Sequence, residues 1–315
     1  MIGAEFTIGG ELRVRRLGYG TGQLTGHGYW GPRMEPAEAV AVLRRAVERG
    51  VTLVDTADNY GPSLAEELVA RALHPYREGV VVATKGGVVR TGPNVWHADG
   101  RPERLRAMCE ASLRRLRTET IDLYQLHRLD PAVPLADQLG TLAELRREGK
   151  IRHIGLDTVT AGELERALEV TEIASVQNRY NVLDRESEPV LRLCEERGLA
   201  FLPWFPLGNG ALTADGPTPG EAAPVETARG SAVLEEAAPG TAVQGEPVPG
   251  SSALGEVARR HGVSAGQVAL AWLLHVSPVT LPTPGTGSLA HLEENLDAAR
   301  VELTPDDLAA LNRLH

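Results

Sequence analysis

The stretch Val51-Thr-Leu-Val-Asp-Thr-Ala-Asp-Asn-Tyr-Gly61 begins as an apolar run and ends as a polar turn. Its first residues are typical of a short buried strand. Asp55 is therefore expected where this strand ends, and Tyr60 in the loop that follows. An acid at the carboxyl end of a strand, followed by a loop tyrosine, is how α/β barrels present catalytic side chains. A buried acid that caps a turn, beside an ordinary loop aromatic, would give the same local pattern, so the rest of the chain must decide.

Short apolar runs alternate with helical patterns along almost the whole chain. Besides 51–55, strands are predicted at 17–22, 79–84, 121–126, 152–156, 174–177, 199–204 and 278–281. Helices are predicted at 34–48, 63–73, 102–117, 135–148, 161–170, 187–197, 251–261, 265–276, 288–299 and 305–313, with a long loop at 86–101. Ser63 and Glu66 have the spacing of a capping box at the start of the second helix.

The number of strand–helix units decides the fold class. Eight strands, each followed by helical sequence, indicate parallel βα units. In a chain of 315 residues this is the pattern of a (β/α)8 TIM barrel, so residues 1–315 are expected to form a single domain. A doubly wound open sheet is the alternative, which is disfavoured because no G-x-G-x-x-G opens a helix after the first strand.

Two segments fall outside this alternation. Residues 5–16 alternate around a glycine pair and predict an N-terminal β-hairpin that closes the bottom of the barrel. Residues 213–250, in the loop after strand seven, are rich in Ala, Pro, Gly and Glu and carry six acids against one base. Such a composition cannot pack a core and predicts a flexible low-complexity insertion. A lid over the active face and a passive tether are both open interpretations.

Charge and composition exclude several classes of function. The net charge of −10 argues against nucleic acid or an anionic membrane as the main partner. No apolar run approaches the roughly 20 residues that span a bilayer, and the N-terminus does not resemble a secretory signal. Cys109 and Cys194 lie far apart in helical patterns, so no disulfide or thiolate metal site is indicated. A cytoplasmic protein, as a monomer or a weak homo-oligomer, is the simplest expectation.

Four side chains are expected to converge at one end of the barrel. Asp55, Lys85 and His127 end the second, third and fourth predicted strands, and Tyr60 lies in the loop after the first of these. Adjacent strand ends lie within side-chain reach of one another in a barrel. Each residue alone has a structural explanation, such as an ion pair or a packed aromatic. Together they indicate a catalytic site.

The chemistry that suits this group is proton donation to a carbonyl oxygen. Tyrosine is a poor acid at neutral pH, and a nearby Lys85 ammonium is expected to lower the pKa of Tyr60. Asp55 would hold Lys85, and His127 would orient the carbonyl oxygen and share in proton transfer. No serine or cysteine nucleophile joins the group, and no metal-ligand spacing is present. The missing partner is therefore expected to be a hydride donor.

Asp55, Tyr60, Lys85 and His127, in this order and spacing, resemble the catalytic tetrad of the aldo-keto reductases. The resemblance covers nearly the whole chain apart from 213–250. Further stretches that resemble the family are Gly149-Lys-Ile-Arg-His-Ile-Gly155, Ser175-Val-Gln-Asn-Arg-Tyr-Asn181, Trp204-Phe-Pro-Leu-Gly208 and Leu281-Pro-Thr-Pro-Gly-Thr286. Within the family, Arg16-Leu-Gly-Tyr-Gly, Tyr60-Gly-Pro and Leu73-His-Pro-Tyr76 are most similar to bacterial pyridoxal reductases.

The resemblance implies a barrel that binds NADPH across its C-terminal face. Gln177 would hold the carboxamide, Trp204 would stack on the nicotinamide, and Leu207 with Gly208 would meet the pyrophosphate. The helix N-terminus at 285–288 would meet the adenosine phosphate, and Glu294 with Asn295 would contact adenine. The full implied set of cofactor-binding residues is Gly20, Thr21, Asp157, Gln177, Trp204, Phe205, Pro206, Leu207, Gly208, Gly285, Thr286, Gly287, Ser288, Glu294 and Asn295.

The chain departs from the family pattern at three places. Asp157-Thr158 stands where the family commonly has Ser-Asn, so contacts to the carboxamide would differ. Gly287-Ser288 stands where a basic residue commonly meets the 2′-phosphate, although His291 would partly compensate. NADPH is still the expected cofactor, with NADH as an alternative. The third departure is the insertion at 213–250.

The implied activity is the NADPH-dependent reduction of an aldehyde or ketone, with pyridoxal as one candidate substrate. Loop aromatics are expected to wall the substrate pocket, namely Tyr29, Trp30, Trp96 and Phe205, although Trp30 and Trp96 could simply anchor long loops. One alternative is a regulatory subunit of the same fold that binds NADPH without turnover. Another is a Schiff-base aldolase that uses Lys85.

Overall fold

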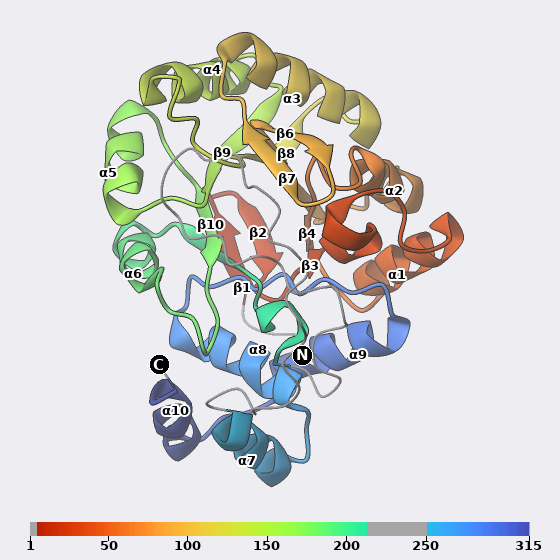
Figure 1. Cartoon of the computed structure of the whole chain (residues 1–315), viewed down its shortest axis with the longest axis vertical. Helices are drawn as coiled ribbons and strands as arrows, with labels where there is room; N and C mark the ends of the chain where they lie inside the picture. The colour runs from red at the N-terminus through yellow and green to blue at the C-terminus, as the bar shows by residue number, and fades with distance from the viewer. Residues whose placement is uncertain (1–4, 213–250, 315) are drawn as a thin grey trace.

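The structure is a computed structural model that describes residues 5–212 and 251–314. The predicted insertion at 213–250 lies outside the described residues. A central parallel sheet is surrounded by helices (Figure 1). In hydrogen-bonded order its strands are β11 (Ala200–Trp204), β10 (Ser175–Arg179), β9 (Ile151–Asp157), β8 (Ile121–Leu126), β5 (Val81–Gly86), β4 (Leu53–Asp55) and β3 (Tyr19–Gly20).

The segment at 279–285 closes this sheet into a barrel. On one edge Phe201 N donates to Val279 O at 2.9 Å, and Leu281 N donates to Phe201 O at 2.8 Å. On the other edge Gly18 N donates to Pro282 O at 3.0 Å. The predicted strand at 278–281 is thus present only as one isolated bridge, between Thr280 and Phe201, because the prolines around it have no N–H to give a ladder. The (β/α)8 fold class is confirmed.

The helices cover the outer face of the barrel and lie within a few residues of their predicted positions. Capping boxes at Thr160, Ser264 and Thr304 start three of them. The helices are α1 (Pro36–Glu48), α2 (Leu64–Leu73), α3 (Pro102–Leu116), α4 (Leu135–Arg147), α5 (Ala161–Val170), α6 (Glu188–Arg197), α7 (Ser251–His261), α8 (Ala265–Val276), α9 (Leu289–Asp297) and α10 (Pro305–Asn312). Short 3₁₀ turns lie at Gly22–Leu24, His27–Tyr29, Gly208–Gly210 and Ala298–Arg300.

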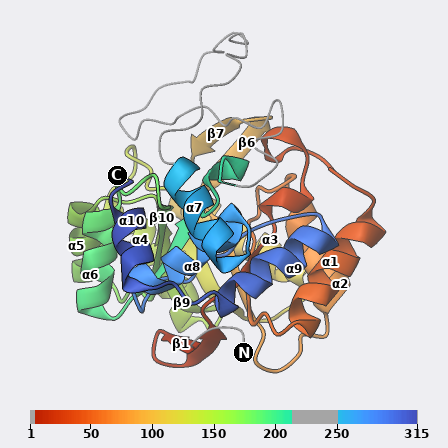
Figure 2. The ribbon, with the colours of Figure 1, turned by 90° about the horizontal axis from the view of Figure 1, so that it is seen from below.

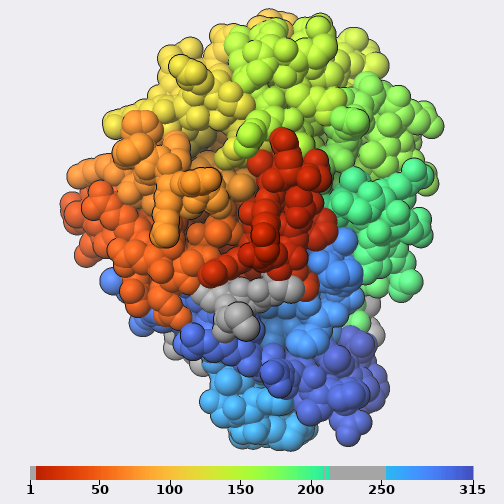
Figure 3. Space-filling model, turned by 180° about the vertical axis from the view of Figure 1, so that it is seen from behind, coloured from red at the N-terminus to blue at the C-terminus, as the bar shows by residue number. Residues whose placement is uncertain are grey.

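The predicted N-terminal hairpin is present as β1 (Glu5–Ile8) and β2 (Leu12–Arg15). It lies across one end of the barrel (Figure 3). Ile8 packs with apolar residues from inside the barrel, such as Leu53 and Leu123, so the hairpin closes that end. The turn needs glycine at position 9, since φ is +59° there and a Cβ would stand 2.2 Å from the His153 ring.

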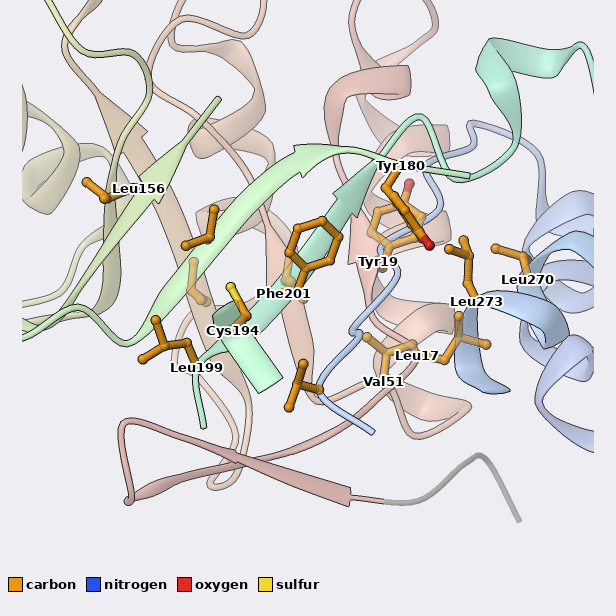
Figure 4. Packing of buried hydrophobic residues seen from close by; sticks show 14 of the residues in the cluster. Leu17, Tyr19, Val51, Leu156, Tyr180, Cys194, Leu199, Phe201, Leu270 and Leu273 are labelled. Carbon is orange, nitrogen blue, oxygen red and sulfur yellow. The ribbon is translucent and has the colours of Figure 1, made fainter. Parts of the chain in front are cut away.

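The main hydrophobic core lies between the barrel strands and the surrounding helices. Tyr180 and Phe201 meet edge to face in it, with ring centroids 5.7 Å apart. Cys194 is buried in the same cluster as a free thiol (Figure 4). Among the described residues, no helix is long and apolar enough to cross a membrane.

Two local predictions were wrong. The capping box at Ser63 is absent, because buried Glu66 instead accepts hydrogen bonds from Thr84 Oγ1 and Arg115 Nε, each at 2.6 Å. The expected loop at 86–101 contains a β-hairpin, β6 (Val88–Gly92) and β7 (Val95–Ala98). This hairpin stands at the end of the barrel opposite to β1 (Figure 2), where the strands' carboxyl ends lie.

Candidate active site

A buried ion pair lies at the centre of the site. Asp55 ends β4 and Lys85 lies near the end of neighbouring β5. Lys85 Nζ donates to Asp55 Oδ2 at 2.7 Å and to the Thr56 carbonyl oxygen at 2.9 Å, and the lysine side chain is fully buried. A buried charge is stable only when it is paired and hydrogen-bonded, and these contacts satisfy both conditions.

Two glutamines complete the shell around Asp55. Gln125 Nε2 donates to Asp55 Oδ1 at 3.1 Å, and Gln177 Nε2 donates to Asp55 Oδ2 at 3.2 Å. The carboxylate therefore accepts from three donors that come from three other strands, β5, β8 and β10. Because each donor is itself fixed in the sheet, Asp55 holds Lys85 in a single position.

Tyr60 lies over this ion pair. Lys85 Nζ is 5.1 Å from the centre of the Tyr60 ring. Burial raises the pKa of Tyr60 well above its usual value, and Asp55 and Asp157 raise it further. The expectation of a lowered pKa for this tyrosine was therefore wrong, since burial is the largest cause and Arg90 is the charge that acts in the opposite direction. The hydroxyl keeps its proton at neutral pH.

His127 stands beside Tyr60 at the end of β8. The two rings meet edge to face with centroids 6.1 Å apart. His127 Nδ1 is 3.0 Å from Asn59 Nδ2, and its Nε2 is 3.9 Å from Asp157 Oδ2. Burial lowers the pKa of His127 well below its usual value, and the charges of Lys85, Arg128 and Arg90 lower it further, so the imidazole is neutral. The structure thus brings all four predicted side chains together.

Two of the aromatics expected at the pocket, Tyr29 and Trp96, lie next to these two rings and are called the aromatic wall below. Tyr29 stacks on Tyr60 with centroids 5.3 Å apart, and Trp96 meets His127 at 5.8 Å. Arg90 lies 3.6 Å from the centre of the Trp96 ring and 5.9 Å from that of Trp30.

Arg90 also fixes the backbone of this wall. Its guanidinium donates to the carbonyl oxygens of Gly28, Gly92 and Val95. It therefore ties the loop after β3 to the β6–β7 hairpin. Phe205 lies apart from this group, against Trp204, with ring centroids 4.8 Å apart.

Asp157 ends β9 and its carboxyl group faces His127. Thr158 Oγ1 donates to Asp157 Oδ1 at 2.7 Å, and Thr158 has a φ of +57°, which is costly for a β-branched residue. Burial raises the pKa of Asp157 to about 7, while Lys85 acts in the opposite direction. This acid therefore changes charge in the neutral pH range.

Replacing Asp157 with asparagine should stabilise the protein in a pH-dependent way. An aspartate in the unfolded chain loses its proton near pH 4, whereas folded Asp157 keeps it to about pH 7. Folding stability therefore falls across this interval by about 1.36 kcal/mol per pH unit. Below pH 4 the variant should match the wild type, and above pH 7 it should be more stable by up to roughly 4 kcal/mol.

Urea unfolding of both proteins at several pH values between about 4 and 8 measures this difference. Glu119→Gln, a change at an exposed acid outside the helices, is the control and should leave the free energy of unfolding nearly unchanged. Parallel profiles for the wild type and Asp157→Asn would show that Asp157 ionises normally.

Several residues of the implied cofactor site have polar atoms that could bind a cofactor. Gln177 Oε1 and Trp204 Nε1 are buried without a hydrogen-bond partner, and the former suits a carboxamide N–H₂ donor. Ser288 caps α9 by accepting from His291 N at 3.4 Å, and Ser288 N donates to Thr286 Oγ1. This donor-rich helix start suits a phosphate. The residues present therefore fit a dinucleotide at this face.

Other residues expected to contact the cofactor make structural contacts within the described chain. Gly20 and Gly285 form a bridge across the barrel closure, where a Cβ on Gly20 would stand 2.6 Å from Thr283 O. Thr21 is buried and its hydroxyl donates to Thr56 Oγ1 at 2.8 Å. The Glu294 carboxylate accepts from the Ser264 hydroxyl. Contacts of Leu207, Gly208, Gly287 and Asn295 with a cofactor stay predictions.

Sequence reasoning missed three residues of the site. Gln125 donates to Asp55, Asn59 contacts His127, and Arg90 holds the aromatic wall. Gln125 could have been found, because it lies two residues before His127 and so projects from the same face of the strand. No local pattern marks Asn59 or Arg90. Within the described residues, no group of three or more potential metal ligands occurs.

The fold is a (β/α)8 barrel with a buried polar site at the carboxyl ends of its strands, and comparison with known proteins identifies its family. The family model described as "Aldo/keto reductase family" matches residues 16–315. The chain belongs to the aldo/keto reductase family and is an oxidoreductase.

Relatives and solved structures agree with this membership. The chain is 41% identical over 303 residues to an uncharacterized oxidoreductase of Schizosaccharomyces pombe, covering 96% of this chain and 87% of the relative. It is 34% identical over 313 residues to the pyridoxine 4-dehydrogenase of Escherichia coli, covering 98% and 96%. Its fold is similar to that of an aldo-keto reductase from Klebsiella pneumoniae solved with NADPH, with a TM-score of 0.74, 25% identity and coverage of 100% and 95%.

Proposed function

We propose that this protein reduces an aldehyde or ketone to an alcohol, with NADPH as the cofactor and Tyr60 as the proton donor. The observation that carries the proposal is the buried Lys85–Asp55 pair directly under Tyr60, with His127 beside it. NADPH, when bound, supplies the hydride that the carbonyl carbon accepts. The solved relative with NADPH supports this cofactor.

The chain's own residues account for the proton. The carbonyl oxygen is placed between the Tyr60 hydroxyl and His127 Nε2, and Tyr60 releases its proton to this oxygen as negative charge develops there. The resulting tyrosinate lies beside the Lys85 ammonium, which stabilises it by charge attraction in a water-poor site. Tyr60 then takes a proton from solvent, and the cycle can repeat.

The aromatic wall supports a flat, unsaturated substrate. Tyr29 and Trp96 present ring surfaces next to the catalytic pair. Pyridoxal is the first candidate, because it is an aromatic aldehyde and because the Escherichia coli relative is a pyridoxine 4-dehydrogenase.

The Schiff-base alternative is disfavoured by the geometry of Lys85. A Schiff base requires an unprotonated amine that reaches the substrate. Lys85 Nζ instead donates to Asp55 and Thr56 and is fully buried. Two of its N–H donors are therefore taken by Asp55 and Thr56, which disfavours its attack on a substrate carbonyl.

A substrate screen tests the proposal. Purified protein is mixed with a panel of aldehydes and ketones that includes pyridoxal, and NADPH and NADH consumption are followed in parallel. We expect turnover of at least one carbonyl compound, with a preference for NADPH. Tight NADPH binding without turnover of any compound would instead favour a regulatory subunit that binds the cofactor.

A further inference from the structure

Asn59 is a buried side chain that bridges the two sides of the catalytic site. It immediately precedes Tyr60 in the loop after β4 and is only 4% exposed. Its Nδ2 is 3.0 Å from His127 Nδ1 and 3.4 Å from the carbonyl oxygen of Val88. These contacts join the catalytic loop to the end of β8 and to the β6–β7 hairpin.

The second contact decides which way the amide faces. A backbone carbonyl oxygen can only accept a hydrogen bond, so the atom that faces Val88 O must be the Asn59 nitrogen. The reversed amide would place Asn59 Oδ1 against that oxygen and leave the nitrogen without an acceptor. The same nitrogen faces His127 Nδ1, and an amide nitrogen can only donate. His127 Nδ1 therefore accepts and carries no proton.

The proton of the imidazole then lies on its other nitrogen. A neutral imidazole has one N–H, and His127 is neutral because burial and the nearby cations lower its pKa. With Nδ1 as the acceptor, the N–H is at Nε2. Asp157 Oδ2 is 3.9 Å from Nε2, which is too far for a hydrogen bond. The charged or titratable groups around His127 are Lys85 of β5, Arg90 of β6, Arg128 after β8, Asp157 of β9 and Tyr60.

We propose that Asn59 is a positioning residue that fixes the tautomer of His127, so that Nε2 presents an N–H to the carbonyl oxygen of the substrate. This inference rests on the proposed function. It makes His127 a hydrogen-bond donor that orients and polarises the carbonyl, and it leaves the proton transfer to Tyr60. The expectation that His127 shares in proton transfer is replaced by a division of roles between the two side chains.

The tautomer of His127 can be measured without substrate or cofactor. Long-range ¹H–¹⁵N NMR spectra distinguish protonated from unprotonated imidazole nitrogens. The protein has nine histidines, and the signal that disappears in His127→Gln identifies residue 127. In the wild type we expect an unprotonated Nδ1 and a protonated Nε2. A protonated Nδ1 in the wild type would overturn the inference, whatever the variants do.

Asn59→Asp reverses the polarity of the hydrogen bond at nearly constant shape. A carboxylate only accepts, so Nδ1 of His127 should become protonated, either by a tautomer change or by uptake of a second proton. Asn178→Asp is the matched control, because Asn178 is a buried asparagine of β10 that bonds Val159 and Ser187 but not His127. It should leave the His127 signals unchanged. Unchanged signals in Asn59→Asp would contradict the proposal.

Activity separates this inference from the proposed function. In Asn59→Asp, kcat for a carbonyl substrate should fall at least about tenfold, with NADPH affinity little changed. A wild type with the expected tautomer but no turnover would reject the proposed function and leave the tautomer assignment in place. A wild-type protein that turns over the substrate normally but has a protonated His127 Nδ1 would reject the role of Asn59 and leave the proposed function in place.

Discussion

Replacing Tyr60 with phenylalanine should lower kcat by at least about 10²-fold, the low end of typical acid catalysis, while NADPH affinity stays nearly unchanged. The substitution removes only the hydroxyl, so the ring can still stack on Tyr29 and face His127. The loss affects kcat because the proton is transferred in the transition state. Binding of the substrate or cofactor does not require this transfer. Steady-state kinetics with a carbonyl substrate, together with NADPH titration by fluorescence, measure both quantities.

Tyr76→Phe is the matched control for this change. The Tyr76 hydroxyl donates to the Leu116 carbonyl oxygen at 2.7 Å, outside the barrel, and has no contact with the tetrad. This variant should lose on the order of 1 kcal/mol of stability at most and keep its activity. Near-normal turnover in Tyr60→Phe would remove Tyr60 from the role of proton donor.

Replacing Lys85 with methionine should destabilise the fold by about 3–5 kcal/mol and abolish turnover. The methionine fills a similar volume, but Asp55 then remains buried with two amide donors and no cation. An uncompensated buried charge is expensive, and the same substitution takes away the ammonium that stabilises the Tyr60 anion. Urea unfolding gives the first effect, and kinetics at a temperature where the variant is folded give the second.

A double variant distinguishes the loss of charge balance from a simple packing defect. Lys85→Met with Asp55→Asn removes both charges and should recover part of the stability lost in the single variant, without recovering activity. If the double variant is less stable than Lys85→Met alone, the ion pair is not the source of the destabilisation.

Tyr60 and Lys85, the residues changed in these two predictions, could be identified from the local sequence. Asp55, Lys85 and His127 each follow an apolar run, and runs of this length at this spacing predict parallel strands. Parallel strands of a barrel end on the same face, so three polar strand ends predict one site. Tyr29 and Trp96 were expected near the site for the same reason, although Trp96 lies in strand β7 and not in the expected loop. The local pattern could not predict how deeply each side chain is buried or which charged groups surround it.

The pKa of Tyr60 illustrates this limit. A lysine nearby suggested a lowered pKa, but desolvation of the hydroxyl and the carboxylates of Asp55 and Asp157 raise it. Desolvation depends on how many atoms surround a group, and these atoms come from the whole fold. The predicted capping box at Ser63 was wrong for a related reason, because the Glu66 side chain bonds Thr84 and Arg115 instead.

By itself the sequence determined the alternation of strands and helices, the hairpin at the bottom of the barrel, and the meeting of Asp55, Tyr60, Lys85 and His127 at one site. These depend on residue type and spacing, which are local. Only the tertiary structure decided how residues 279–285 close the barrel, why Asp157 changes charge near neutral pH, and how Asn59 reaches His127 across 68 positions of sequence. Hydrogen-bond partners and desolvation are set by segments that meet only when the chain is folded.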